Sequence, residues 1–295
     1  SPGGRLPLTI RGVCPALALT HRLTIASVQV KSVLVLAGLK TPGITTVVEP
    51  VATRDHTERM LQLFGARIQV APSAGGREIA LRGEAKLRPQ QVEVPGDPSS
   101  AAFLAVAALI VPDSEIRIEN VGVNPMRMGL YETLREMGAA LSFTNERLVS
   151  GEPVADLLVR HSVLRGVRVP AERVPSMIDE FPIFFIAAAF AEGESRAEGL
   201  AELRVKESDR VAAMAAGLRA IGAEVEESDD GLVIGGSGGH PPAGGAAIGS
   251  VLDHRIAMSF AVAGLRCEAP VTVDDMTPVD TSFPGFAAAL QGLCR

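Results

Sequence analysis

The stretch AAGLRAIGAEVEE, residues 215–227, joins an amphipathic helical pattern, a glycine and a run typical of a β-strand. A glycine just past the last helical turn takes up the left-handed backbone conformation that ends a helix. We therefore predict a helix that ends at Gly222 and a strand that follows it. The same order of helix, glycine and strand recurs along the chain, and this recurrence indicates the fold class.

Three further stretches share the pattern: ERMLQLFGARIQV (58–70), YETLREMGAALSF (131–143) and the shorter FAAALQGLCR (286–295). Each is predicted to be an amphipathic helix closed by a glycine, namely Gly65, Gly138 and Gly292. Strand-like runs follow the first two. The glycines are spaced by roughly 70–85 residues, which is too long for a solenoid repeat and suits small α/β units.

A more apolar helix is predicted before each amphipathic one: SVQVKSVLVLAGL (27–39), PSSAAFLAVAALIV (98–111), DEFPIFFIAAAFAEG (179–193) and DHRIAMSFAVAGL (253–265). Each begins near a Ser or Asp suited to cap a helix. They are apolar nearly all round, so all four are expected to be buried. A short strand-like run separates the two helices of each copy. The sequence therefore predicts an α/β fold of repeated units around buried helices, with a hinge at VPGDPSS (94–100).

Composition excludes several classes of protein. The chain has 295 residues, 47% of them apolar, and a net charge of −6, so it lacks the basic excess of a nucleic-acid-binding domain. No apolar run approaches the roughly 20 residues of a membrane span. Cys14, Cys267 and Cys294 follow no metal-ligand spacing. We predict reduced thiols in a cytoplasmic protein that binds neither nucleic acid nor membrane.

Charged residues gather where helices are predicted to begin: TRDHTER (53–59), SMIDEFP (176–182), RVKESDR (204–210) and LDHRIAM (252–258). Free backbone N–H groups and the helix dipole favour anions there, and added Arg or Lys makes a phosphate or carboxylate site. Lys206 and Arg210 are four residues apart and are expected to share one helix face, with Glu207 beside them. The alternative is ordinary capping and solvated surface charge. No His, Cys and acidic cluster has metal-ligand spacing, so no metal is predicted.

Seven motifs in order carry a family resemblance: ASVQVKSVLVLAGL, TRDHTERML, VPGDPSSAAF, SMIDEFPI, LRVKESDR, LDHRIAMSF and TSFPGF. They span nearly the whole chain. The sequence resembles the 5-enolpyruvylshikimate-3-phosphate synthase family, in the bacterial class that includes naturally glyphosate-tolerant members. The resemblance implies an enolpyruvyl transferase fold of two domains with three units each, of which four of six units are present. Residues 1–95 would be a partial substrate-binding domain with one unit, and residues 96–295 the C-terminal domain.

The resemblance also implies an activity. Family members move the enolpyruvyl group of phosphoenolpyruvate to the 5-hydroxyl of shikimate-3-phosphate and release phosphate, a step of aromatic amino acid biosynthesis that glyphosate targets. The implied partners are these two small molecules, with no cofactor and no metal. The family's N-terminal third has no counterpart here, and SPGGRLPLTI (1–10) resembles a stretch from the middle of a longer chain. The chain alone is therefore expected to be inactive without that segment.

Site residues are implied by their places in the motifs. Asp179 resembles the base that receives the 5-hydroxyl proton, and Glu207 the residue that handles the methyl or methylene proton. Lys206 resembles a lysine that contacts shikimate-3-phosphate and is counted with the catalytic residues. Arg210 and Arg255 resemble the arginines that grip phosphoenolpyruvate.

Three more residues are implied in the part of the chain before the predicted hinge. Ser27 and Gln29 lie in the shikimate-3-phosphate motif, with Gln29 reaching both ligands, and Arg54 resembles the arginine that contacts the phosphate. Two alternatives stay open. One is the related transferase that acts on UDP-N-acetylglucosamine, and the other is a non-catalytic fragment that assembles with an N-terminal partner.

Overall fold

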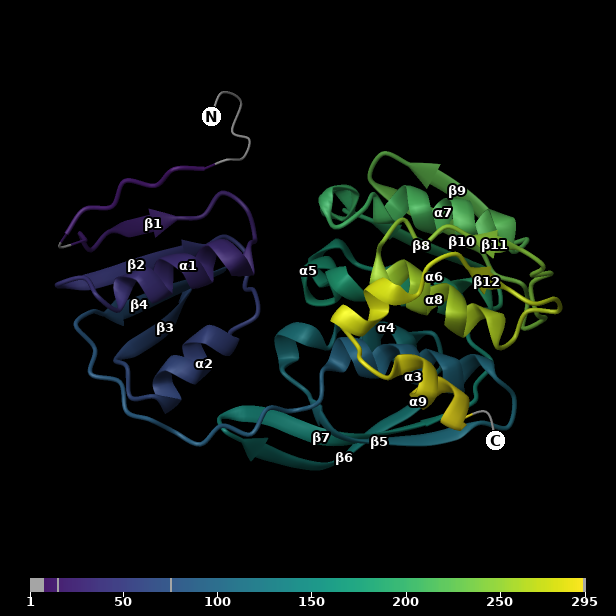
Figure 1. Ribbon diagram of the computed structural model, residues 1–295, viewed down its shortest axis with the longest axis horizontal. Helices are drawn as coiled ribbons and strands as arrows, with labels where there is room; N and C mark the ends of the chain where they lie inside the picture. The colour runs from purple at the N-terminus through teal and green to yellow at the C-terminus, as the bar shows by residue number, and fades with distance from the viewer. Residues whose placement is uncertain (1–7, 15, 75, 294–295) are drawn as a thin grey trace. The chain divides into compact units, whose positions relative to one another are not determined.

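The computed structural model describes residues 8–14, 16–74 and 76–293. The chain divides into two compact units, unit 1 (residues 1–93) and unit 2 (residues 94–295) (Figure 1). These units are defined by their internal contacts. The predicted division into domains at residues 95 and 96 stays a prediction. The predictions for Cys294 and for residues 1–7 lie outside the described residues.

Unit 1 is a four-stranded sheet with two helices packed on one face. Its elements are β1 (Thr20–Arg22), α1 (Val28–Gly38), β2 (Ile44–Glu49), α2 (His56–Leu63), β3 (Ile68–Ser73) and β4 (Gly76–Arg82). The strand order is β1-β2-β4-β3, and only the pairing of β1 with β2 is parallel. Val35 of α1 and Leu61 of α2 join Val47 and Ile79 of the sheet in one hydrophobic core, so both helices cover the same face.

Unit 2 contains three successive helix–strand repeats. Its main elements are α3 (Pro98–Ile110), β5 (Glu115–Gly122), α4 (Gly129–Glu136), β6 (Ala140–Val149), β7 (Glu152–Arg160), α6 (Phe181–Ala189), β8 (Glu194–Glu198), α7 (Arg210–Ala220), β9 (Glu224–Ser228), β10 (Gly231–Gly235), β11 (Ala247–Ile248), α8 (His254–Gly264), β12 (Thr272–Val273) and α9 (Phe286–Leu293). The short helix α5 (Val174–Met177) and several 3-10 turns connect them. The predicted order of apolar helix, strand and second helix is confirmed in all three repeats.

The sheets repeat one topology. In the orders β2-β4-β3, β5-β7-β6 and β8-β10-β9, the last strand of the repeat lies in the middle and pairs antiparallel with both others. Each repeat also takes in a parallel segment from just before its apolar helix. These segments are β1 beside β2, Gly96 beside Val121, residues 165–168 beside residues 192–196, and β11 beside β12.

Burial of the apolar helices is confirmed in unit 2 and wrong for unit 1. Helices α3, α6 and α8 contact one another and are buried along most of their length, as Figure 1 shows at the centre of unit 2. In α1, by contrast, Val30, Val33 and Leu36 are exposed. Among the described residues of unit 1 no second helix of this apolar type packs on α1, so only its sheet-facing side is covered. None of the described helices combines the length and apolarity needed to cross a membrane.

The predicted helix ends are confirmed at three of four glycines. Gly65, Gly138 and Gly222 have φ angles of +88°, +92° and +92°, in the left-handed region. Gly292 instead lies inside α9, which continues to Leu293. Glycine permits the left-handed conformation without requiring it, so its position alone does not end a helix.

The helix starts match the predicted caps only in part. Ser27 caps α1 and Asp253 caps α8 through their side chains, as predicted. Helix α3 is capped by Asp97 and not by a serine, because the Asp97 carboxylate accepts the backbone N–H of Ser100. Helix α6 begins at Phe181 without a side-chain cap, since Asp179 lies in the preceding 3-10 turn η4 (Ile178–Glu180).

Candidate functional site

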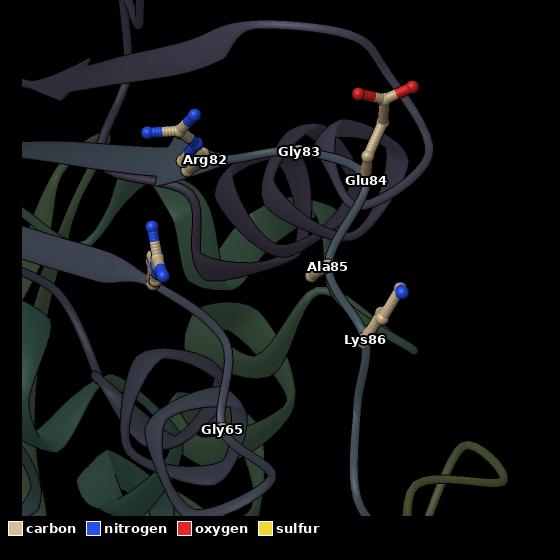
Figure 2. A pocket seen from close by; sticks show the side chains of 7 residues that line it. Gly65, Arg82, Gly83, Glu84, Ala85 and Lys86 are labelled. Carbon is tan, nitrogen blue, oxygen red and sulfur yellow. The ribbon is translucent and has the colours of Figure 1, made fainter.

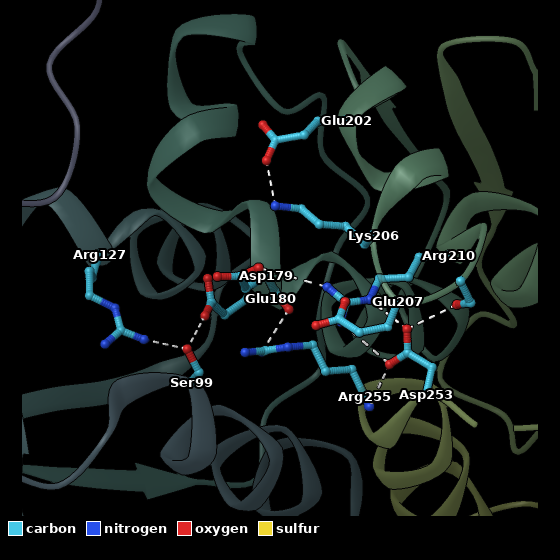
Figure 3. Close-up of polar contacts among 11 residues, drawn as sticks. Ser99, Arg127, Asp179, Glu180, Glu202, Lys206, Glu207, Arg210, Asp253 and Arg255 are labelled. Carbon is cyan, nitrogen blue, oxygen red and sulfur yellow. Dashed lines mark hydrogen bonds and ion pairs between the residues drawn. The ribbon is translucent and has the colours of Figure 1, made fainter. Parts of the chain in front are cut away.

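The buried guanidinium of Arg210 is the centre of a charged cluster in unit 2. Its side chain is 1% exposed. Nε donates to Asp253 Oδ2 at 2.8 Å, Nη2 donates to Glu207 Oε2 at 2.6 Å, and Nη1 lies 3.7 Å from Asp179 Oδ1 (Figure 3). Carboxylates from the segment before α7, from the turn η4 and from the start of α8 thus surround one cation at the first residue of α7.

Asp253 is the enclosed member of this cluster. Its side chain is fully buried, and it also accepts hydrogen bonds from the Arg255 backbone N–H and from Ser208 Oγ, both at 2.9 Å. Burial by itself raises the pKa of Asp253, but the hydrogen bond and charge of Arg210, together with the hydrogen bonds from Arg255 and Ser208, outweigh it and hold the pKa below its ordinary value. Asp253 is therefore a fixed anion that orients Arg210.

The other two carboxylates lie nearer to solvent. The side chain of Asp179 is 18% exposed and that of Glu207 is 52% exposed. A guanidinium can exchange a carboxylate partner for another planar or tetrahedral anion, because its N–H groups form a fork. Accessible carboxylates beside such an anion can accept and return protons. The cluster therefore brings together a guanidinium that can bind an anion and two carboxylates that can exchange protons.

Arg255 holds the backbone of the turn that carries Asp179. Its Nη1 donates to the Asp179 carbonyl oxygen at 2.9 Å from the first turn of α8. The neighbouring His254 has a pKa below its usual value because of burial and the charge of Arg255, which favours the neutral imidazole. Asp179, Glu207, Arg210 and Arg255 are thus brought together as the sequence analysis expected, although their predicted roles remain proposals.

Sequence reasoning missed a second chain of contacts behind Asp179. Glu180 accepts a hydrogen bond from Ser99 Oγ at the start of α3, and Arg127 donates to Ser99. Figure 3 shows this line of contacts from Arg127 through Ser99 to Glu180. Outside that view, Arg127 also pairs with Asp97 at 2.8 Å. These residues anchor the turn after Asp179 to α3. The motif VPGDPSS did mark the start of α3 but indicated only a hinge.

The predicted shared helix face of Lys206 and Arg210 is wrong. Asp209 caps α7 by accepting the backbone N–H of Ala212 at 3.0 Å, so the helix begins only at Arg210. Lys206 lies before it with an extended backbone and pairs with Glu202, toward which it points in Figure 3. Its side chain is 20% exposed and borders the cluster from outside the helix.

The three predicted residues of the first unit lie at two loop-to-helix junctions. Ser27 Oγ caps α1 by accepting the Val30 backbone N–H at 3.3 Å, and Gln29 is exposed in the first turn of that helix. Arg54 is half-buried in the segment between β2 and α2. All three therefore belong to unit 1, whereas the other five predicted residues belong to unit 2.

A basic cavity in unit 1 was not predicted. It measures about 310 Å³ and is lined by Gly65, Arg67, Arg82, Gly83, Glu84, Ala85 and Lys86 (Figure 2). The Arg82 backbone N–H donates to the Arg67 carbonyl at 2.9 Å, which places Arg67, just before β3, opposite Arg82 at the end of β4. None of the predicted site residues lines this cavity. Within the described residues, no group of His, Cys, Asp and Glu could hold a metal ion.

Comparison with known proteins identifies relatives of this arrangement. The sequence profile described as EPSP synthase (3-phosphoshikimate 1-carboxyvinyltransferase) matches residues 2–290. A protein of that name from Sphingopyxis alaskensis is 62% identical over 99% of this chain and 67% of its own length. One from Zymomonas mobilis is 58% identical over 99% of this chain and 65% of its own. The chain thus spans about two thirds of the length of these relatives.

Solved structures agree with the sequence comparison. An EPSP synthase from Acinetobacter baumannii has a TM-score of 0.86 and 46% identity, covering 94% of this chain and 63% of that protein. The enolpyruvyl transferase NikO from Streptomyces tendae has a TM-score of 0.69 at 21% identity, covering 88% of this chain and 57% of that protein, which shows a shared fold.

Proposed function

Because this chain belongs to the EPSP synthase family, we propose that it carries most of the active site of a 3-phosphoshikimate 1-carboxyvinyltransferase. The reaction would join phosphoenolpyruvate to the 5-hydroxyl of shikimate-3-phosphate and release phosphate. The observation that supports this best is that Asp179, from the turn η4, meets Glu207 and Arg210 at the start of α7. Relatives with 56–62% identity carry the name of the shikimate enzyme, so the UDP-N-acetylglucosamine transferase is not favoured.

The proposed roles follow from the contacts. Arg210 and Arg255 would bind the carboxylate and phosphate of phosphoenolpyruvate, with Glu207 giving up its place on Arg210. Asp179 would take the proton of the 5-hydroxyl while the oxygen of that hydroxyl forms a bond to C2 of phosphoenolpyruvate. Glu207 would supply a proton to C3 and recover it as the bond between C2 and the phosphate oxygen breaks and phosphate leaves with the electron pair. Asp179 would then release the proton of the 5-hydroxyl to the departing phosphate or to solvent. Asp253 would keep Arg210 oriented throughout.

The proposed contacts to shikimate-3-phosphate are the four that the family resemblance implies. The residues proposed for these contacts are Ser27, Gln29, Arg54 and Lys206. Lys206 would leave Glu202 to reach the ligand, which is a small cost because exposed ion pairs contribute little. The two units would correspond to the predicted domains. The cytoplasmic location predicted from the sequence also belongs to this proposal, and cell fractionation would test it.

The test is phosphate release from phosphoenolpyruvate and shikimate-3-phosphate. The purified chain is assayed alone and after mixing with the portion of the Sphingopyxis alaskensis relative that it does not match. We expect no detectable turnover alone and turnover on mixing, because several clamps acting together are needed. Asp179→Asn in the mixture should abolish the gain. Turnover with UDP-N-acetylglucosamine in place of shikimate-3-phosphate, or none with either acceptor, would contradict the proposal.

A further inference from the structure

A lysine lies completely buried in the core of unit 1. Lys31 of α1 is 0% exposed, although the residues around it in the helix are mostly apolar. Its Nζ lies 3.3 Å from Glu49 Oε2 and 2.9 Å from Glu58 Oε1, and these two carboxylates are 0% and 4% exposed. A buried ammonium is unfavourable unless it is paired and hydrogen-bonded, so the role of Lys31 in this core calls for an explanation.

The Lys31 ammonium also holds the backbone of the loop that carries Arg54. It donates to the Arg54 carbonyl at 2.7 Å and to the Thr53 carbonyl at 3.4 Å. Glu49 holds the same loop from its other side, because it accepts the Thr53 N–H at 3.2 Å and the Thr53 Oγ1 hydroxyl at 2.7 Å. Lys31 thus binds the carbonyl oxygens of residues 53 and 54, and Glu49 binds the N–H of Thr53.

The same lysine belongs to the first turns of α1. The Lys31 backbone N–H donates to the Ser27 carbonyl at 3.1 Å. Lys31 therefore lies one helical turn after Ser27 and two residues after Gln29. A second link is the hydrogen bond of 2.8 Å between Ser32 Oγ and Thr57 Oγ1, which joins α1 to α2. Lys31 thus connects the two segments that carry the proposed phosphate ligands of unit 1.

We propose that Lys31 is a positioning residue, which sets Arg54 relative to Ser27 and Gln29 so that together they bind a phosphate monoester. This inference rests on the proposed function for the identity of the ligand, shikimate-3-phosphate. Lys31 itself does not contact the ligand, because Glu49, Glu58 and the two carbonyls enclose its ammonium group. Its effect on binding passes through the conformation of residues 53–54.

The experiment compares the wild-type chain with Lys31→Met, with the double variant Lys31→Met/Glu58→Gln, and with Lys40→Met as the exposed control. The double variant removes one buried negative charge together with the ammonium, so it keeps unit 1 folded if the single variant does not. Hydrogen exchange is measured at the amides of residues 53–55 and in α1. Affinities for shikimate-3-phosphate are measured by calorimetry, alone and in combination with Arg54→Ala.

Loss of the hydrogen bonds from Lys31 to the two carbonyls should raise amide exchange at residues 53–55 by about tenfold or more. Binding of shikimate-3-phosphate should weaken by a similar factor, since one hydrogen bond to a charged donor changes an equilibrium by about tenfold or more. Once Arg54 is alanine, the Lys31 substitution should add little further loss, whereas a general destabilisation would add its full cost. Lys40→Met should change neither quantity.

The outcomes separate the two proposals. Unchanged exchange at residues 53–55 in the double variant overturns the positioning role, whether or not the ligand binds. Fully additive losses with Arg54→Ala also overturn it. A third outcome is altered loop exchange in the Lys31 variants together with no affinity of the wild-type chain for shikimate-3-phosphate, measured in the presence of the portion of the relative that this chain does not match. In that case the positioning role stands and the proposed ligand is wrong.

Discussion

Each of the two units buries one cation among carboxylates, but the carboxylates of unit 1 are buried and some of those in unit 2 are exposed to solvent. Lys31 in unit 1 is bonded to Glu49 and Glu58, which are almost fully buried. Arg210 in unit 2 is bonded to one enclosed carboxylate, Asp253, and to Glu207, which is half exposed.

This difference separates a structural use of buried charge from a chemical one. An ammonium surrounded on all sides can only hold backbone in place. A guanidinium with one fixed partner and accessible partners can keep its orientation while the accessible partners change. The comparison predicts that the same kind of substitution has different consequences in the two units.

The largest expected effect comes from removing the cation of unit 2. Arg210→Met should lower the free energy of unfolding by about 3–5 kcal/mol, because Asp253 remains buried without its partner. Urea unfolding followed by circular dichroism measures the change. Arg219→Met is the control, since Arg219 lies in the same helix with its side chain 47% exposed. If both variants differ from wild type by the same amount, Arg210 is not the cation on which the cluster depends.

A smaller effect distinguishes the closed cluster from the open one directly. Glu49→Gln should cost about 2 kcal/mol of unfolding free energy, because Glu49 is buried and bonded to a charged donor. Glu207→Gln should cost less than about 1 kcal/mol, because half of its side chain reaches solvent. Equal costs in urea unfolding would remove the distinction between the units.

The smallest effect is a pH dependence assigned to Asp253. Its pKa is lowered in the folded chain, so its contribution to stability is present above its unfolded pKa of about 4 and is lost as the pH falls through the lower, folded value. One proton changes the unfolding free energy by at most about 1.4 kcal/mol per pH unit. Asp253→Asn should therefore flatten the acid limb of the stability profile. An identical slope in wild type and variant would show that other carboxylates cause it.

Local patterns predicted the repeat well. Gly65, Gly138 and Gly222 end helices because their backbone geometry requires φ above zero, which is a property of one residue. The caps Ser27 and Asp253 were visible because a cap acts within three residues. The location of the charged motifs at helix starts was predictable for the same reason.

Contacts between distant segments were not predictable from the sequence. The pairs of Arg210 with Asp179 and Asp253 join residues from three separate segments, and no spacing rule connects them. The burial of α1 was mispredicted because an apolar helix is covered only where other elements pack on it. Lys31 within that helix was the available signal for a buried ion pair, since a lysine is almost never fully buried unless it is paired.

In each repeat, the segment just before the apolar helix pairs in parallel with a strand of the same repeat. This pairing limits where the chain can be cut into fragments. Each sheet is completed by residues upstream of the helix that begins the repeat, such as Gly96 beside Val121 and β11 beside β12. A fragment cut at the start of α3 or α8 would expose an unpaired strand edge, which promotes association between chains. Fragments for dissection or grafting should therefore begin before β1, Gly96, Arg165 or β11, so that each carries its own edge.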